Sequence, residues 1–172
     1  MEIIVGIVVG LLALNLLSYR ILKPRLIKQQ RWDLNICCGN TSVGRVNADI
    51  VAQPGVNNFM LIPDIYQLPF KDGEFDEVLC SHTLEHVEDP QAFWDELNRV
   101  GKRVTLILPP LWDVAAVLNI FEHRWIFLTF KKAHTTLPPY IRFAFAHYYQ
   151  ERFGHVVANS IWQRLLKSGS SA

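Results

Sequence analysis

The side chains that could take part in chemistry follow short apolar runs of the sequence. Asp49 lies near the end of the second run, Asp64 follows the third, and His82 comes directly after the fourth. An imidazole at such a position can act as a general base or contact a substrate. His86, four residues later, is expected in a helix, where packing or capping competes with catalysis. The two acids are either caps of their loops or ligands of a polar small molecule.

Five short apolar runs, each closed by turn residues, could position these side chains. They span residues 34–38, 46–51, 59–62, 75–81 and 103–108. Their alternation with polar or helical stretches is typical of βαβ units and a parallel sheet. Ligands of open α/β sheets bind at the carboxyl ends of the strands. We therefore expect the polar residues that follow the runs to gather at one edge of the sheet.

One helix of this sheet is well delimited in the sequence. Asp89 is a natural N-cap and Pro90 suits the first helical position, where its missing N–H costs nothing. Gly101 predicts the end of the helix. Between them, apolar side chains recur at the spacing of one helix face: Phe93, Leu97 and Val100.

The first 22 residues predict a transmembrane anchor. Residues 3–19 carry no charge, and as a helix they would be about 25 Å long, nearly the thickness of a hydrocarbon core. A basic linker, residues 23–31, continues a cluster that ends before the first acid, Asp33: Arg20, Lys23, Arg25, Lys28 and Arg31. The positive-inside rule then predicts a single-pass protein with a cytoplasmic C-terminal domain. A buried core helix is the alternative. A cleaved signal would need a basic start, and only Glu2 precedes the run.

Composition excludes several classes of protein and site. The net charge is +1 and 19% of the residues are charged, so no basic field indicates nucleic acid. Cys37, Cys38 and Cys80 are an odd number with an adjacent pair, which argues against a disulfide framework and indicates a reduced, intracellular protein. We expect no metal site, because a site built on these cysteines lacks ligands at close spacing.

Five motifs in order resemble the class I S-adenosylmethionine-dependent methyltransferases, in the subfamily that includes quinone-biosynthesis enzymes. They are Leu34–Asn40, Val46–Asp49, Asp64–Val78 with its Leu-Pro-Phe series, Leu84–Val87 and Glu96–Val100. Residues 122–127 resemble a segment downstream in such proteins. The resemblance implies an α/β fold over residues 32–130, with a Rossmann-like, mostly parallel sheet and helices on both faces, in a shortened form.

The resemblance also implies a site for S-adenosylmethionine. The loop Cys38-Gly39-Asn40 would pass the methionine part, Asp49 would accept the ribose hydroxyls and Asp64 the adenine amino group. The expected cofactor-binding residues are Asn35, Cys38, Gly39, Asn40, Asp49, Ile50, Asp64, Ile65 and Ser81. His82 and His86 are the candidate catalytic residues.

The sequence departs from this family at the first strand. Asn35 stands where the family usually has an acid, and Cys37 and Thr41 stand where it has glycines. The stretch from Asn35 to Asp49 is too short for the usual helix, which needs about eleven residues. We therefore expect a loop or a single turn after the first strand.

The C-terminal segment, residues 131–172, is aromatic and departs from the family pattern. Residues 139–152 predict a helix with aromatic and basic side chains, suited to a membrane interface, to a substrate lid or to ordinary core. No final hairpin of the sheet is evident, and the Ser-Gly-Ser-Ser tail is expected to be disordered.

Two functions remain open at this point. The first is a membrane-anchored methyltransferase acting on a lipid, quinone or other small apolar acceptor, with membrane lipid as its partner. The second is an inactive module of the same fold that serves as a membrane-tethered binding or scaffold protein. The intact Asp49 and Asp64 favour the enzyme, whereas the departures at Asn35, Cys37 and Thr41 favour the inactive module.

Overall fold

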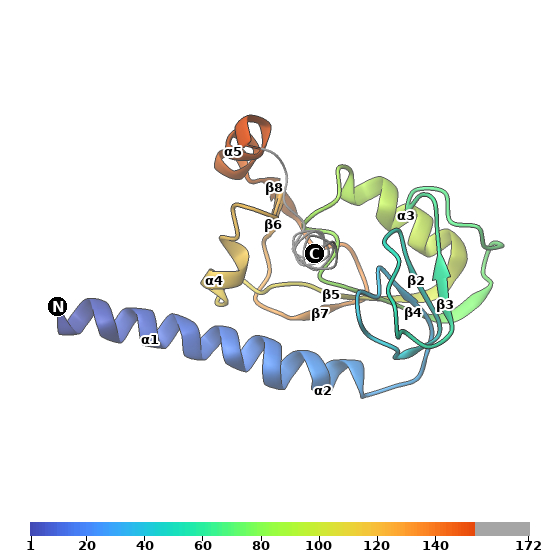
Figure 1. The fold of residues 1–172 in the computed structure, drawn as a ribbon, viewed down its shortest axis with the longest axis horizontal. Helices are drawn as coiled ribbons and strands as arrows, with labels where there is room; N and C mark the ends of the chain where they lie inside the picture. Colours follow the sequence, from blue (N-terminus) through green and yellow to red (C-terminus); the bar gives the residue numbers. More distant parts are fainter. Residues whose placement is uncertain (154–172) are drawn as a thin grey trace, which may run out of the picture.

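The computed structural model describes residues 1–153, which form a mostly parallel sheet with helices on both faces (Figure 1). The strand order is β3-β2-β1-β4-β5-β7, in which only β7 runs antiparallel to its neighbour. The strands are β1 Trp32–Ile36, β2 Gly44–Asp49, β3 Phe59–Leu61, β4 Phe75–Ser81, β5 Gly101–Ile107 and β7 Ala133–His134. The predicted α/β class and the five strands of its sheet are confirmed.

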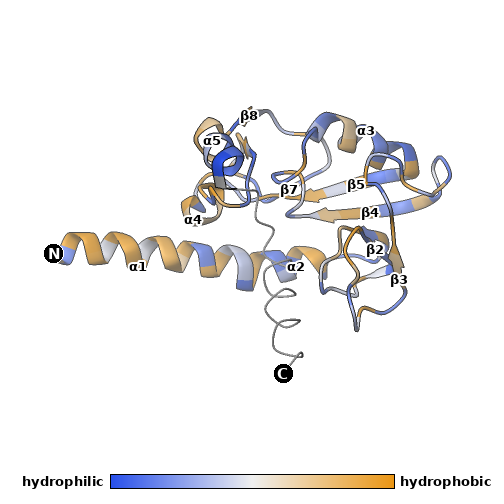
Figure 2. Cartoon of the chain, turned by 45° about the horizontal axis from the view of Figure 1, so that its top comes forward, coloured by the Kyte–Doolittle hydropathy of each residue, from blue (hydrophilic) through white to orange (hydrophobic). Residues whose placement is uncertain are grey.

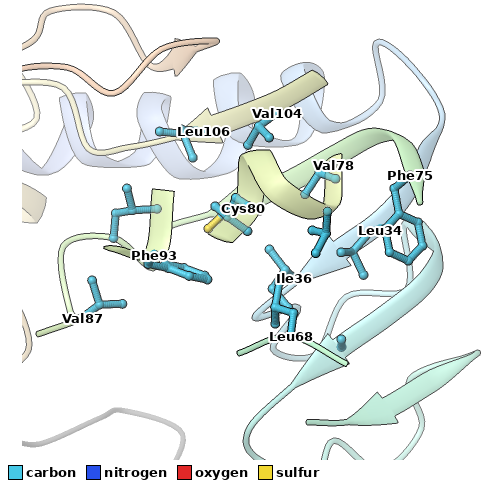
Figure 3. Packing of buried hydrophobic residues seen from close by; sticks show 14 of the residues in the cluster. Leu34, Ile36, Leu68, Phe75, Val78, Cys80, Val87, Phe93, Val104 and Leu106 are labelled. Atoms are coloured by element: carbon cyan, nitrogen blue, oxygen red, sulfur yellow. The ribbon is translucent and has the colours of Figure 1, made fainter. Parts of the chain in front are cut away.

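The apolar runs form strands because their side chains are buried on both faces of the sheet. Leu34, Val78 and Leu106 belong to the main core cluster, which faces α3 (Pro90–Val100) (Figure 3). Neighbouring residues of the same strands, Leu79 and Ile107, point to the opposite face. Burial on both faces explains why these strands read as continuous apolar runs.

Helix α3 begins and ends where the sequence predicts. The Asp89 carboxylate accepts the backbone N–H of Ala92 at 3.0 Å, and Gly101 ends the helix and opens β5. The apolar stripe of the helix is fully buried against the sheet: Phe93, Leu97 and Val100. The connection from β4 to α3 therefore has a fixed end at the helix, and this β4–α3 loop contains both candidate catalytic histidines, His82 and His86.

The N-terminal helix is longer than the predicted anchor and continues through part of the predicted linker. It comprises α1 (Glu2–Leu16), a π-helical segment (Leu17–Leu22) and α2 (Lys23–Ile27). The π-helical segment precedes Pro24, which cannot donate an intrahelical hydrogen bond, and such local widening accommodates the loss. Figure 2 shows hydrophobic residues along α1. No residue of α1 is buried by the described part of the chain.

The end of this helix covers the second face of the sheet. Ile27 packs with Trp32, Leu79 and Ile107 in a small core cluster. The Trp32 indole N–H also donates to the Ile27 carbonyl at 2.7 Å. The helix is therefore part of the domain and is joined to β1 by a short connection.

The C-terminal region differs from the prediction in two respects. The predicted helix over residues 139–152 begins only with α5 (Ala144–Phe153), because β8 (Tyr140–Arg142) pairs with β6 (Trp125–Phe127). The sheet also gains the antiparallel strand β7, where no hairpin was evident from the sequence. A short helix, α4 (Val114–Val117), lies beside α1. The predicted disordered tail lies outside the described residues.

Candidate cofactor and substrate site

A cavity of about 630 Å³ opens at the carboxyl ends of the central strands. Its size is within the usual range for small-molecule sites. Residues that follow β1, β2, β3 and β4 form its wall, and the segment before β6 closes it. The lining residues are Cys37, Gly39, Asp49, Ile50, Val51, Pro63, Asp64, Ile65, Tyr66, His82, Thr83, His86, Val87, Glu88, Glu122 and Arg124.

The loop after β1 replaces a helix and is held by polar side chains beneath it. The Asn35 side-chain amide donates to the Thr41 carbonyl oxygen at 3.3 Å and to the Asn47 side-chain oxygen at 3.1 Å. Both asparagines are buried. Cys37 and Gly39 have φ angles of 50° and 51°, which is common for glycine and strained for cysteine. This turn lets the chain reach β2 without a helix, as the sequence predicts.

The two acids lie on the cavity wall with their carboxylates already oriented. Asp49 accepts the backbone N–H of Gly39 on one oxygen at 2.9 Å and that of Val51 on the other at 3.0 Å. Asp64 accepts the backbone N–H of Tyr66 at 2.8 Å. A carboxylate oxygen has two lone pairs, so these contacts leave acceptor capacity toward the cavity.

His82 connects the cavity wall to the N-terminal helix. It follows β4 with a φ angle of 55°, an unusual conformation that tends to occur at functional sites. Its Nδ1 lies 3.1 Å from a Glu85 oxygen and 3.1 Å from the Tyr19 hydroxyl, and its Nε2 lies 3.4 Å from the Lys132 ammonium, which donates to Ser18. Burial lowers the pKa of His82 despite the carboxylate beside it, so the imidazole is neutral near pH 7.

The ionisable groups near His82 have pKa values that differ strongly from their usual ones. Burial would raise the pKa of Glu85, but the hydrogen bond from His82 outweighs it and holds the pKa of this carboxyl below its usual range. Burial lowers the pKa of His123 to about 4 and that of Lys132 to about 8. Buried groups with shifted pKa values beside a cavity are typical of functional sites.

The cysteines are thiols rather than thiolates. All three are free. Burial raises the pKa of Cys38 to about 11, and it also raises the pKa values of Cys37 and Cys80 well above the usual range. Protonated thiols are poor metal ligands and poor nucleophiles.

The family model described as "Methyltransferase domain" matches residues 34–107, which include β1 to β5 and most of the cavity wall. Over these residues the chain is therefore similar to a methyltransferase domain. The expected resemblance to methyltransferases is thereby confirmed, and methyltransferases of this kind imply S-adenosylmethionine as the cofactor.

Solved structures of low identity resemble part of this chain. An S-adenosylmethionine-dependent methyltransferase from Thermotoga maritima, described as a possible histamine N-methyltransferase, is 17% identical, with a TM-score of 0.45 over 56% of this chain and 52% of its own. A methyltransferase from Methanosarcina mazei is 18% identical, with a TM-score of 0.41 over 63% and 74%. A Pyrococcus horikoshii protein is 17% identical, with a TM-score of 0.44 over 77% and 78%. The chain thus spans about half the length of the Thermotoga protein.

The ends of the central strands bring most of the predicted site residues together at the cavity. They are Gly39, Asp49, Ile50, Asp64, Ile65, His82 and His86. Four other predicted residues are not among those that line it: Asn35, Cys38, Asn40 and Ser81. Asn35 instead holds the loop after β1, and Cys38 is buried under that loop.

Other residues of the site were missed by the sequence analysis. Glu122 and Arg124 reach the cavity from the segment before β6, and Tyr66 lines it after β3. Glu85, Tyr19 and Lys132 surround His82. Glu85 stands in the recognised motif 84–87, whereas the positions of Tyr19 and Lys132 depend on contacts between distant segments that no local pattern indicates.

Proposed function

We propose that this chain is an S-adenosylmethionine-dependent methyltransferase, held at a membrane by the helix Glu2–Ile27, that acts on a lipid, quinone or other small apolar acceptor. The observation that carries the proposal is the cavity at the strand ends of the methyltransferase-like domain, with two oriented carboxylates on its wall. Open α/β sheets bind their ligands at this edge.

The residues of the cavity fit the cofactor that the family implies. Gly39 lines the wall and has no side chain, so the backbone can approach a ligand closely. The Asp49 carboxylate, fixed by two backbone N–H groups, suits a pair of vicinal hydroxyls such as those of a ribose. Asp64 suits an exocyclic amino group. When bound, S-adenosylmethionine supplies an electrophilic methyl group.

The rest of the wall suits an acceptor. Thr83 and Val87, from the β4–α3 loop, and Tyr66 place apolar and weakly polar groups around the cavity. Methyl transfer requires an acceptor atom in line with the methyl group, and proximity with alignment can supply much of the rate. Both ring nitrogens of His82 have partners within the protein, so we assign this residue to holding the wall in place.

The N-terminal helix supports the membrane part of the proposal. Residues 2–27 are long and apolar enough to cross a membrane. Asn15 donates to Asp113 at 3.0 Å and Ser18 is buried, so the helix contacts the domain from about residue 15 onward. The free part, residues 2–14, would be about 20 Å long, less than a hydrocarbon core of about 30 Å. We infer that the face of the domain around α4 enters the membrane interface.

Exposed apolar side chains on that face support this placement. Leu118 and Phe121 follow α4, Phe130 precedes β7, and Phe145 and Tyr148 lie on α5, all of them half exposed or more. Aromatic residues are favoured at membrane interfaces. The basic residues at the end of the helix favour a cytoplasmic domain by the positive-inside rule.

One observation favours the alternative, an inactive binding module. Cys37 lines the cavity in a strained left-handed conformation, at a position where the family has glycine. A side chain there narrows the approach of a ligand to the backbone. Binding of the cofactor without methyl transfer to any acceptor would support this alternative.

Calorimetry of the detergent-solubilised full chain with S-adenosylmethionine and with its demethylated product tests the proposal. We expect binding of both, and methyl transfer from labelled cofactor into a lipid or quinone extract. The absence of binding at millimolar cofactor would refute the enzyme and leave the cavity without its proposed ligand. A Cys37→Gly variant should bind the cofactor at least as tightly as the wild type, since it removes a side chain and the strain.

A further inference from the structure

Two histidines and a glutamate meet beside the cavity and are not needed for the proposed cofactor contacts. Glu85 and His86 lie in the β4–α3 loop, and His123 follows α4 from the C-terminal third of the domain. One potential ligand atom of each lies within 4.8 Å of the other two. Glu85 and His123 are buried, and His86 lines the cavity. We call these residues the His-Glu cluster.

Hydrogen bonds fix the orientation of both imidazoles. His86 Nδ1 lies 3.0 Å from the Glu122 carbonyl oxygen, and His123 Nδ1 lies 3.4 Å from the Val117 carbonyl oxygen. A carbonyl oxygen can only accept, so each Nδ1 carries the proton and each Nε2 keeps its lone pair. Metal-binding histidines typically have this arrangement, in which the outer nitrogen donates to a carbonyl.

Glu85 supplies the third group. Its first carboxylate oxygen accepts from His82, but its second, Oε2, is buried and has no hydrogen-bond partner among residues 1–153. A buried carboxylate oxygen without a partner costs free energy comparable to a lost hydrogen bond to a charged group. A cation held between Oε2 and the two Nε2 atoms would satisfy all three atoms.

We propose that Glu85, His86 and His123 bind a zinc-type divalent transition-metal ion at the edge of the cavity. Two imidazole nitrogens with one carboxylate suit zinc and its neighbours, whereas magnesium and calcium prefer oxygen ligands alone. In a tetrahedral zinc site with bonds of about 2.0–2.1 Å the ligand atoms lie ~3.3 Å apart, so the distances within the cluster would have to shorten by up to about 1.5 Å.

The position of the cluster gives the ion two roles. First, the ion would join the β4–α3 loop to the segment after α4. Without the ion these two segments are linked by contacts such as the hydrogen bond from the Arg124 backbone N–H to the Glu85 carbonyl oxygen. Three protein ligands leave a fourth coordination position, and through His86 the site borders the cavity. That position suits an oxygen atom of the acceptor. This second role depends on the proposed methyl transfer, whereas binding of the metal does not.

The test uses the full chain in detergent, stripped with a chelator and titrated with zinc chloride and with cobalt chloride. We expect one ion per chain, with cobalt visible absorption of a four-coordinate site and no thiolate charge-transfer band. Each of the variants Glu85→Gln, His86→Gln and His123→Gln should weaken binding by more than the 10- to 100-fold typical of a lost outer contact. His147→Gln, at a histidine of α5 that pairs with Glu151 and is not part of the cluster, should bind as the wild type does.

Folding of each variant is checked by its melting temperature without metal. His86 is only partly buried, so its variant should keep the fold even where the buried positions do not. The proposal is overturned if the wild type takes up no stoichiometric ion, if cobalt shows a thiolate band, or if folded His86→Gln binds with unchanged affinity. Cofactor calorimetry on the same samples separates the two proposals. Cofactor binding without metal uptake refutes only the site, and metal uptake without cofactor binding refutes only the proposed enzyme.

Discussion

Replacement of Asp49 by alanine should affect both folding and cofactor binding, in amounts that can be separated. The buried carboxylate accepts two backbone N–H groups, at 2.9 and 3.0 Å from Gly39 and Val51. Hydrogen bonds to charged groups contribute about 1.5–3 kcal/mol each, and the lower end of this range for two bonds gives a loss of stability of about 3 kcal/mol. For a chain of this size that lowers the melting temperature by about 6–12 °C. Loss of the ribose contacts should weaken cofactor binding by a further 1–3 kcal/mol, about 5- to 150-fold in Kd.

Asp33 provides a matched control at the opposite end of β1. Its carboxylate also accepts two backbone N–H groups, those of Asp76 and Glu77, each at 3.1 Å, but it is not among the residues that line the cavity. Asp33→Ala should therefore lower the melting temperature and leave the Kd unchanged. Calorimetry with the demethylated cofactor, performed well below both melting temperatures, compares the two variants. If folded Asp49→Ala retains the wild-type Kd within about twofold, Asp49 serves only to hold the loop, and our assignment of the ribose contact is wrong.

Three further predictions concern the start of β2, a buried lysine and the proposed orientation in the membrane. A Cβ at Gly44 would lie 2.8 Å or less from two backbone atoms, so Gly44→Ala should destabilise the domain by about 1–3 kcal/mol in chemical denaturation, whereas Gly10→Ala, with open space around it, should not. Burial lowers the pKa of Lys132 to about 8, below the ~10.4 of an unfolded chain, so the unfolded state binds more protons between these values. The free energy of unfolding should therefore rise with pH from about 8 to 10, and Lys132→Met should abolish this contribution. A cysteine introduced at the exposed Lys71 should react with impermeant maleimide only after cells are opened, and labelling of intact cells would contradict the cytoplasmic placement.

The parts of the fold that local signals specify were predictable from the sequence. Asp89 and Gly101 delimit α3 because caps act on adjacent backbone groups, and the apolar run of β4 has the same limits in the sequence and in the structure. The C-terminal third was not predictable in this way. Tyr140–Arg142 has strand geometry only because Trp125–Phe127 pairs with it, and that pairing is non-local.

The same distinction applies to the candidate site. Asp49 and Asp64 could be proposed because they follow strands, and the sheet places strand ends together. His123 approaches Glu85 and His86 only through the path of the chain around α4, which no spacing in the sequence indicates. Our expectation that no metal binds considered the cysteines and did not include this cluster.

Three polar contacts from the middle of the N-terminal helix hold it against the domain, so the proposed membrane anchor would be a rigid arm. Asn15 binds Asp113, Ser18 accepts from Lys132 and the Tyr19 hydroxyl lies 3.1 Å from His82, all on one short stretch of helix. A domain on a flexible tether would sample a hemisphere above the bilayer. On this arm the mouth of the cavity would stay at one height and diffuse laterally with the helix. The proposed enzyme would then select acceptors by the depth at which their reactive atom resides in the lipid, before any contact within the cavity discriminates between them.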